Sequence, residues 1–204
     1  ANMSHEIRNP LNSIIGLSNN LSRNVTEPEY REIVESLKIS SGYLLNILNN
    51  ILDFSKIEAE KVEIQCNNFK PEELIREVYL VFVTSARQKH IELSYTVSAS
   101  KNIVLFGDSG KLKQMLINMV SNSIKFTESG YVRISAFVGK PKNGQCLLKI
   151  DIADTGIGIK EEDHAKVFQS FTQIDSSTTK SYSGTGLGLA IVKSYADKLK
   201  GKIY

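Results

Sequence analysis

The stretch that decides the fold is LLKIDIADTGIG, residues 147–158. From Leu148 to Ile152 apolar residues alternate with charged ones, and this period of two predicts a strand with one buried and one solvated face. Asp154 is the next residue on the buried side, where another aliphatic side chain would be expected. Because burying a carboxylate without a partner is unfavourable, we expect a hydrogen-bond donor to meet Asp154.

Two glycines, Gly156 and Gly158, follow at once and allow the backbone to turn and another group to approach closely. Asp154 then has two interpretations. It is either a solvated aspartate that begins an Asp-Thr-Gly turn, or a fixed acceptor that the strand end presents to a ligand with an N–H group. The rest of the chain favours the second interpretation.

The composition is that of an ordinary globular protein, with 41% hydrophobic and 23% charged residues in 204, enough for one or two domains. The net charge of +3 does not indicate a nucleic-acid partner. Cys66 and Cys146 lack metal-ligand spacing and fit a reducing cytosol. No signal peptide or membrane-length apolar run is present. We therefore expect a cytoplasmic chain without nucleic-acid or membrane contact, and its start inside a helix indicates an excerpt of a longer protein.

The first sixty or so residues read as two long helices, residues 1–24 and residues 28–61, joined by a short loop. Thr26 and Glu29 have capping-box spacing at the start of the second helix. Each helix has a narrow apolar seam, and a lone hairpin buries little, so we expect two copies to pair as a homodimeric four-helix bundle. The seams comprise Ile7, Leu11, Ile14, Leu21 and Val25, with Ser18 as the polar exception, and then Ile33, Leu37, Leu44, Leu48 and Ile51.

The remainder, residues 62–204, reads as a second domain in which helices pack on a mixed sheet, so the fold class is α+β. A strand-like VEIQ pattern opens it, and Pro71 begins a helix with Leu74, Val78 and Val81 on one face. The other elements expected before the glycine-rich segments are helices at 71–88 and 110–126 and strands at 91–97, 103–106, 131–138 and 145–153.

The helix predicted at 110–126 carries a polar stripe beside its apolar face. Lys111, Asn118, Asn122 and Lys125 follow one another at helical spacing. Asparagine is a poor residue for a helix interior, so two of them one turn apart indicate a function. Amide oxygens next to lysine suit a hydrated Mg²⁺ and phosphate oxygens, and we interpret the stripe as a metal-phosphate surface.

The segment after the 147–158 stretch is long and mostly polar. Residues 159–183 contain Phe168 and Phe171 as aromatic anchors, and we interpret this segment as a lid. The glycine-rich run 184–188 then leads into an apolar helix, and glycines at a helix start form an anion site. Lys180 adds a nearby positive charge.

Two common nucleotide motifs are excluded by spacing. A P-loop needs Gly-Lys-Ser/Thr after its spacer, which neither glycine cluster has. The dinucleotide fingerprint needs a third glycine where Leu189 and Glu161 stand. The site therefore belongs to another nucleotide fold.

Five motifs in order resemble those of sensor histidine kinases, in which a dimerisation and phosphoacceptor hairpin precedes a GHKL-type ATP-binding domain. Ser4–Pro10 resembles the family's H box. The stretch from Asn118 through Asn122 to Lys125-Phe126-Thr127 resembles its N box. The G1, F and G2 boxes resemble residues 154–158, 168–171 and 184–188. The resemblance touches both predicted domains, 1–61 and 62–204, and favours hybrid kinases that carry their own receiver domain. It also implies the cytosolic part of a larger, often membrane-anchored sensor.

The resemblance implies a role for each matched residue. His5 would attack the γ-phosphate of ATP, Glu6 would be its base or orienting partner, and Asn9 would orient water for a phosphatase activity on the partner. Asp154 would accept from the adenine amino group and Asn122 would hold Mg²⁺. The phosphoryl group would then pass to an aspartate of a response-regulator receiver domain. The implied nucleotide-binding residues are Asn118, Asn122, Lys125, Asp154, Gly156, Gly158, Lys180, Gly184, Thr185, Gly186, Leu187 and Gly188.

The chain departs from the family pattern in a few places. Ser123, Lys180, Ser183 and Lys200 replace a usual Ala, Arg, Gly and Gly, and the chain stops at Tyr204 where the family adds further strands, so we expect a truncated ATP domain. Two alternatives remain: a GHKL-type ATPase, whose water-activating Glu is replaced here by Asn118, and a non-catalytic module that binds nucleotide or dimerises.

Overall fold

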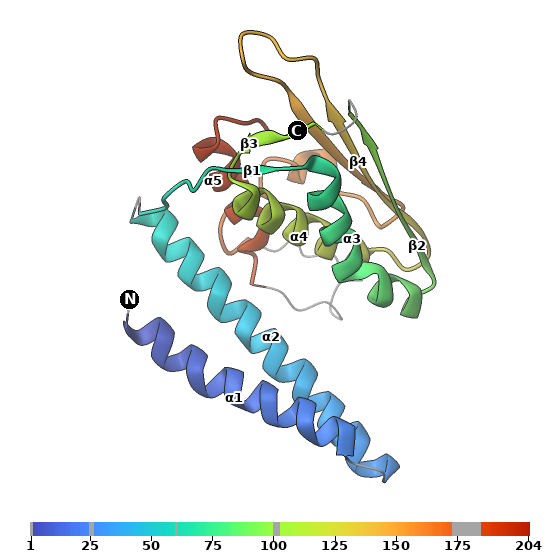
Figure 1. Cartoon of the computed structure of the whole chain (residues 1–204). Helices are drawn as coiled ribbons and strands as arrows, with labels where there is room; N and C mark the ends of the chain where they lie inside the picture. The colour runs from blue at the N-terminus through green and yellow to red at the C-terminus, as the bar shows by residue number, and fades with distance from the viewer. Residues whose placement is uncertain (1, 25–26, 60, 100–102, 173–184) are drawn as a thin grey trace. The chain divides into compact units, whose positions relative to one another are not determined.

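The computed structural model describes residues 2–24, 27–59, 61–99, 103–172 and 185–204 (Figure 1). The chain divides into two compact units, Ala1–Val62 and Glu63–Tyr204. The first is helical and the second combines helices with strands, which confirms the α+β class predicted from the sequence. Within the described ranges, each helix is too short or too polar to span a lipid bilayer.

The first unit is a helical hairpin of α1 (Asn2–Asn24) and α2 (Pro28–Glu58), as predicted. Helix α1 continues through Pro10. Helix α2 begins with Pro28 in its first turn, but its N-cap is Glu27 and makes no side-chain capping bond. The N-cap is therefore one residue later than Thr26, which lies outside the described residues together with the predicted capping box.

Among the described side chains of one hairpin, the predicted seam is buried only in part, at Leu11 and at its polar member Ser18. Within one chain the side chains of Leu11, Ser18, Val34 and Ser41 are buried. Ser18 is fully buried, and its hydroxyl donates to the Ile14 carbonyl at 2.7 Å, which satisfies it inside its own helix. Most of the predicted seam is at least 42% exposed, namely Ile7, Ile14, Leu21, Ile33, Leu37, Leu44 and Ile51.

The second unit is built on a mixed three-stranded sheet in the order β2-β4-β5. Strand β2 (Ile91–Ser98) runs parallel to β4 (Gly130–Val138), which pairs antiparallel with β5 (Leu148–Asp154). Alternate residues of β4 are buried, from Val132 to Val138, so one face of the sheet forms the core. The register places Ile134 opposite Ile152, which confirms the period-two pattern of the opening stretch.

Helices α3 (Pro71–Gln88) and α4 (Ser109–Phe126) cover the buried face of this sheet (Figure 1). Helix α3 has the predicted bounds, but Val81 is 53% exposed and Ile75 is buried in the core instead. Helix α5 (Gly188–Lys198) packs against α4, and a short 3₁₀ helix, Glu161–Asp163, follows the sheet. Lys200, where the family usually has glycine, has φ of +56°, a conformation that favours glycine.

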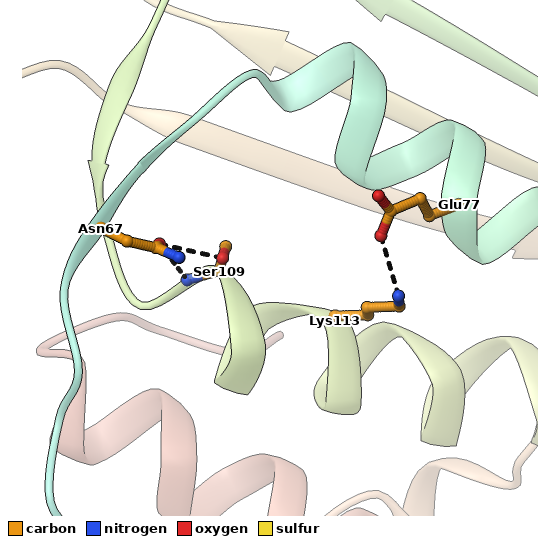
Figure 2. Close-up of polar contacts among 4 residues, drawn as sticks. All are labelled: Asn67, Glu77, Ser109 and Lys113. Carbon is orange, nitrogen blue, oxygen red and sulfur yellow. Dashed lines mark hydrogen bonds and ion pairs between the residues drawn. The ribbon is translucent and has the colours of Figure 1, made fainter.

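A second, two-stranded sheet fastens the start of this unit to α4. Strand β1 (Asn67–Phe69) pairs antiparallel with β3 (Leu105–Gly107) and follows directly on the alternating VEIQ residues, 62–65, which are themselves outside the strand. Figure 2 shows the Asn67 carboxamide oxygen accepting from the Ser109 hydroxyl at 2.9 Å. In the same view the Lys113 ammonium pairs with Glu77 at 2.8 Å and joins α4 to α3.

Asp108 lies at the centre of this fastening, as the N-cap of α4. One carboxylate oxygen accepts from the Lys111 backbone N–H at 2.9 Å, and the other accepts from the Gln65 N–H at 2.8 Å. The residue is only 4% exposed. A single buried carboxylate therefore begins the helix and also holds the segment that enters the unit from the hairpin.

Candidate functional site

The polar stripe predicted on α4 forms, and it faces the start of α5. Asn118, Asn122 and Lys125 are all partly buried on α4. The Asn118 amide donates to the Gly188 carbonyl at 3.4 Å, which joins the middle of α4 to the first residue of α5. The Lys111 ammonium lies 4.9 Å from the centre of the buried Tyr195 ring on α5. The stripe and the second glycine cluster therefore belong to one site.

The C-terminal end of α4 places Lys125 in this site. Its ammonium lies 4.8 Å from the centre of the Phe126 ring, and burial lowers the pKa of Lys125 below its ordinary value of 10.5. A cation that burial disfavours is stabilised by an anion beside it, so this position suits a phosphate group.

Lys89, just beyond α3, holds the same end of α4. Its ammonium donates to the carbonyls of Ile124 and Lys125 at 2.9 and 3.1 Å, where the helix dipole is negative. The sequence analysis did not identify Lys89 as part of the site. It lies 35 residues from Ile124 in the chain, and no local pattern marks it.

The opening stretch ends at the same helix end. Asp154 pairs with the buried Val132, so it lies on the core-facing side of β5 as predicted, but it is exposed because β5 ends there. One of its oxygens accepts from the Gly156 N–H at 3.0 Å. This is the Asp-Thr-Gly turn that the sequence left open, and it holds the exposed carboxylate at the strand end.

Both glycines of this turn are required by geometry. A Cβ on Gly156 would come 2.7 Å from the Phe126 carbonyl oxygen, so a side chain there would force the turn away from α4. Gly158 has φ of +68°, which side chains rarely adopt. The turn therefore lies close against the end of the polar stripe.

The described part of the predicted lid contacts the second glycine cluster through its backbone. The Phe171 N–H donates to the Gly186 carbonyl at 3.1 Å. Gly186 has φ of +68°, and a Cβ there would come 2.9 Å from the Thr172 carbonyl oxygen. Phe171 is 66% exposed and Phe168 is partly buried, so Phe171 is not the aromatic anchor that we expected.

Two further residues of the second glycine cluster, Thr185 and Leu187, have different surroundings. The Thr185 hydroxyl accepts from the Leu187 N–H at 3.4 Å. The Leu187 side chain is fully buried in the core, so only its backbone is suited to bind a ligand. Lys180 and Gly184 lie outside the described residues.

The three residues of the predicted phosphoacceptor motif belong to the other unit. His5 and Glu6 lie within α1, and their side chains are outside the described part of the structure. Asn9 is exposed on the same helix. The structure therefore gathers the N-box, G1 and G2 residues in the second unit and places the H-box residues in the first.

The residues present can bind Mg²⁺ through an amide oxygen, with phosphate oxygens and water as its other ligands. Among the residues that the structure describes, no group of three or more His, Cys, Asp or Glu side chains could hold a metal ion. The available ligand is the amide oxygen of Asn122, a hard oxygen of the kind that Mg²⁺ accepts together with phosphate oxygens and water. The site thus suits Mg²⁺ that arrives with a phosphate ligand.

Two family models match the chain in succession. The His Kinase A (phospho-acceptor) domain matches residues 1–60. The histidine kinase-, DNA gyrase B-, and HSP90-like ATPase matches residues 107–204. With this fold and this site, the chain belongs to the sensor histidine kinase family.

Curated relatives match the whole chain. Sensor histidine kinase GacS of Pseudomonas protegens is 39% identical over 203 residues, 100% of this chain and 22% of that protein. The autoinducer 2 sensor kinase/phosphatase LuxQ of Vibrio cholerae is 38% identical over 206 residues, 100% of this chain and 24% of that protein. Hybrid signal transduction histidine kinase K of Dictyostelium discoideum is 38% identical over 212 residues, 100% of this chain and 17% of that protein. The chain thus spans about a fifth of the length of these relatives.

Solved structures agree with this assignment. Full-length ShkA in complex with AMPPNP is 33% identical and has a TM-score of 0.72. The match covers 97% of this chain and 40% of the ShkA chain. The nucleotide-free catalytic domain of histidine kinase ThkA is 30% identical and has a TM-score of 0.54. The match covers 69% of this chain and 87% of the ThkA chain. ThkA in complex with the response regulator protein TrrA is 26% identical and has a TM-score of 0.58. The match covers 98% of this chain and 54% of that chain.

Proposed function

We propose that this chain is the catalytic core of an ATP-dependent protein histidine kinase that phosphorylates its own His5. The observation that carries the proposal is the Asn118–Gly188 hydrogen bond, which joins the N-box helix to the G2 glycines and makes one nucleotide site of two distant motifs. The ShkA structure with an ATP analogue supports ATP as the ligand.

The nucleotide site assigns separate tasks to its residues. Asp154 accepts from the adenine amino group, while Lys125 and Lys180 contact phosphates together with the backbone of residues 184–188. Asn122 holds Mg²⁺, which would neutralise charge on the phosphate oxygens. Burial of Lys125 supports its part, because a phosphate offsets the cost of its desolvation.

The chemical step is a phosphoryl transfer to an imidazole. A ring nitrogen of His5 forms a bond to the γ-phosphorus, the bond from that phosphorus to the bridging oxygen breaks, and ADP leaves. Glu6 takes or orients the proton on the other side of the ring. Because His5 and the nucleotide site belong to different units, the step requires His5 to reach the nucleotide that the second unit binds.

The partners follow from the same assignment. A response-regulator receiver domain accepts the phosphoryl group on an aspartate, supported by the ThkA complex with TrrA. The matched hybrid kinase K supports a receiver domain within the parent protein. Asn9, exposed on α1, orients water for dephosphorylation of that partner, supported by the kinase/phosphatase name of LuxQ. We place the reaction in the cytoplasm.

A second copy of the chain completes the hairpin unit. The exposed row of aliphatic residues on α1 and α2 includes Ile33 at 59% and Leu44 at 53% exposure. Such a row at seam spacing is typical of a helix pair that packs against another helix pair. A homodimeric four-helix bundle covers it.

Transfer of label from [γ-³²P]ATP tests the proposal. With Mg²⁺ the full chain should acquire label that is lost in acid and retained in base, as expected for a phosphorus–nitrogen bond. Label that is stable in acid would contradict a histidine acceptor. Nucleotide binding without any label would favour a binding module over a kinase, and release of inorganic phosphate without a labelled protein would favour an ATPase.

Asp154→Asn should weaken ATP binding by about 10- to 100-fold, because a hydrogen bond to a charged acceptor contributes roughly 1.5–3 kcal/mol. The preference for ATP over GTP should fall as well, because guanine presents an oxygen where adenine presents the amino group. Calorimetric titration of both nucleotides measures this. Asp151→Asn is the matched control, since Asp151 lies on the same strand in an exposed ion pair with Lys149. Equal losses in the two variants would contradict the assigned role of Asp154.

A further inference from the structure

Two backbone segments lie side by side at the edge of the nucleotide site. One is the turn after β5, residues 154–157, and the other is the connection from α4 to β4, residues 126–131. The Ile157 N–H donates to the Phe126 carbonyl at 3.4 Å, and the Thr155 N–H donates to the Tyr131 carbonyl at 3.2 Å. The position of the turn is therefore set by this connection.

The Thr155 hydroxyl adds to these backbone contacts. It accepts from the Tyr131 N–H at 3.0 Å and donates to the Ser129 carbonyl at 3.0 Å, with the Tyr131 carbonyl at 3.4 Å. A hydroxyl has one donor and two acceptor positions, so Thr155 uses both functions on one short segment. Its side chain fastens the turn to the connection.

Gly130 makes room for this hydroxyl. It has φ of +105°, and a Cβ at that position would overlap the Thr155 oxygen. The glycine and the threonine therefore form a matched pair, one on each segment. This fit goes beyond what a solvated turn requires.

We propose that Thr155 is a positioning residue for nucleotide binding, which acts through Asp154. The carboxylate of Asp154 is exposed and is bonded to the Gly156 N–H of its own turn, so its direction depends on the backbone of residues 154–156. Thr155 lies between those two residues and holds that backbone against Ser129 and Tyr131, which follow α4 in the chain. This inference rests on the proposed ATP site and assigns a further residue to it.

Thr155→Val keeps the shape of the side chain and removes the hydroxyl, so it separates hydrogen bonding from packing. The dissociation constant for ATP should rise about 10-fold, because the N–H of Tyr131 and the Ser129 carbonyl each lose a partner. Thr155→Ser keeps the hydroxyl and should bind ATP within about twofold of the native chain. The labelling rate at saturating ATP should change by less than about threefold in both Thr155 variants. At saturation the site is occupied even when its affinity for ATP is lower.

Thr96→Val is the matched control. Thr96 lies exposed on β2 of the same sheet and makes one 3.3 Å contact to the Ser135 hydroxyl. Its removal should leave ATP affinity unchanged. If Thr155→Val does not fold, Thr155→Cys replaces it, because a thiol is a weak hydrogen-bonding group and should shift affinity in the same direction.

A double-mutant cycle separates positioning from general stability. In the Asp154→Asn background, Thr155→Val should cause no further loss of ATP affinity, because its effect passes through the carboxylate. Independent, additive losses would overturn the positioning role, and so would native affinity in Thr155→Val alone.

Amide hydrogen exchange of the nucleotide-free chain provides a readout that does not depend on ATP. The Tyr131 amide should exchange about 10-fold faster in Thr155→Val and at the native rate in Thr155→Ser. Unchanged exchange would overturn the fastening itself. If the native chain does not bind ATP, the proposed function fails, whereas native ATP binding with unaltered affinity in Thr155→Val overturns only this inference.

Discussion

His5→Gln is expected to abolish labelling from [γ-³²P]ATP while nucleotide affinity stays within about twofold of the native chain. Glutamine offers no nucleophilic ring nitrogen, so the bond to phosphorus cannot form. ATP affinity is retained because the nucleotide residues belong to the unit Glu63–Tyr204, and His5 belongs to the unit Ala1–Val62. Labelling and calorimetric titration on the same preparation measure both effects.

The other two histidines of the chain serve as controls. His90→Asn is conservative in backbone terms, because His90 is exposed with φ of +57° and asparagine tolerates that region. His164→Gln changes an exposed ring whose nitrogen contacts the Ile159 carbonyl at 3.1 Å. Both variants should label like the native chain. Label that survives in His5→Gln and disappears in either control would identify a different acceptor.

Asp108→Ala should destabilise the second unit by about 2–4 kcal/mol. About 1 kcal/mol is the usual cost of losing an N-cap, and a further 1–3 kcal/mol comes from leaving the N–H of Gln65 without its acceptor. Native-state hydrogen exchange at the buried Val120 amide of α4 reads this change within the unit itself.

Two variants bracket the Asp108 result. Asp108→Asn retains one acceptor oxygen and should fall between Asp108→Ala and the native chain. Asp151→Ala removes an exposed carboxylate, in an ion pair of 3.0 Å with Lys149, and should change stability by less than about 1 kcal/mol. A native exchange rate in Asp108→Ala would contradict the role assigned to this carboxylate.

Local patterns predicted the elements of the second unit well. The helix Pro71–Gln88 was predicted to the residue, because proline marks its start and the turn after Gln88 marks its end. The strand at 148–154 followed from its period of two. The alternation at 62–65 did not locate the short strand Asn67–Phe69 that follows it, because four alternating residues show periodicity but not a pairing partner.

The failures share a physical cause, which is dependence on distant residues. The exposure of Val81 depends on which distant elements pack against α3, and the exposure of Asp154 depends on what covers the end of β5. Within the site, the sequence named the N-box and G1 residues, but Lys89 and Asp108 act across 35 and 43 positions of chain. Contacts at such separation have no signature in local spacing.

Among the hairpin side chains that the structure describes, Leu11, Ser18, Val34 and Ser41 are buried within one chain, and two of these four are serines. Its own core is therefore small, and the larger aliphatic side chains are left for association. When a second copy supplies the missing burial, folding of this unit obeys mass action, and its free energy depends on protein concentration. The concentration of the chain then sets the fraction of hairpin units that are assembled.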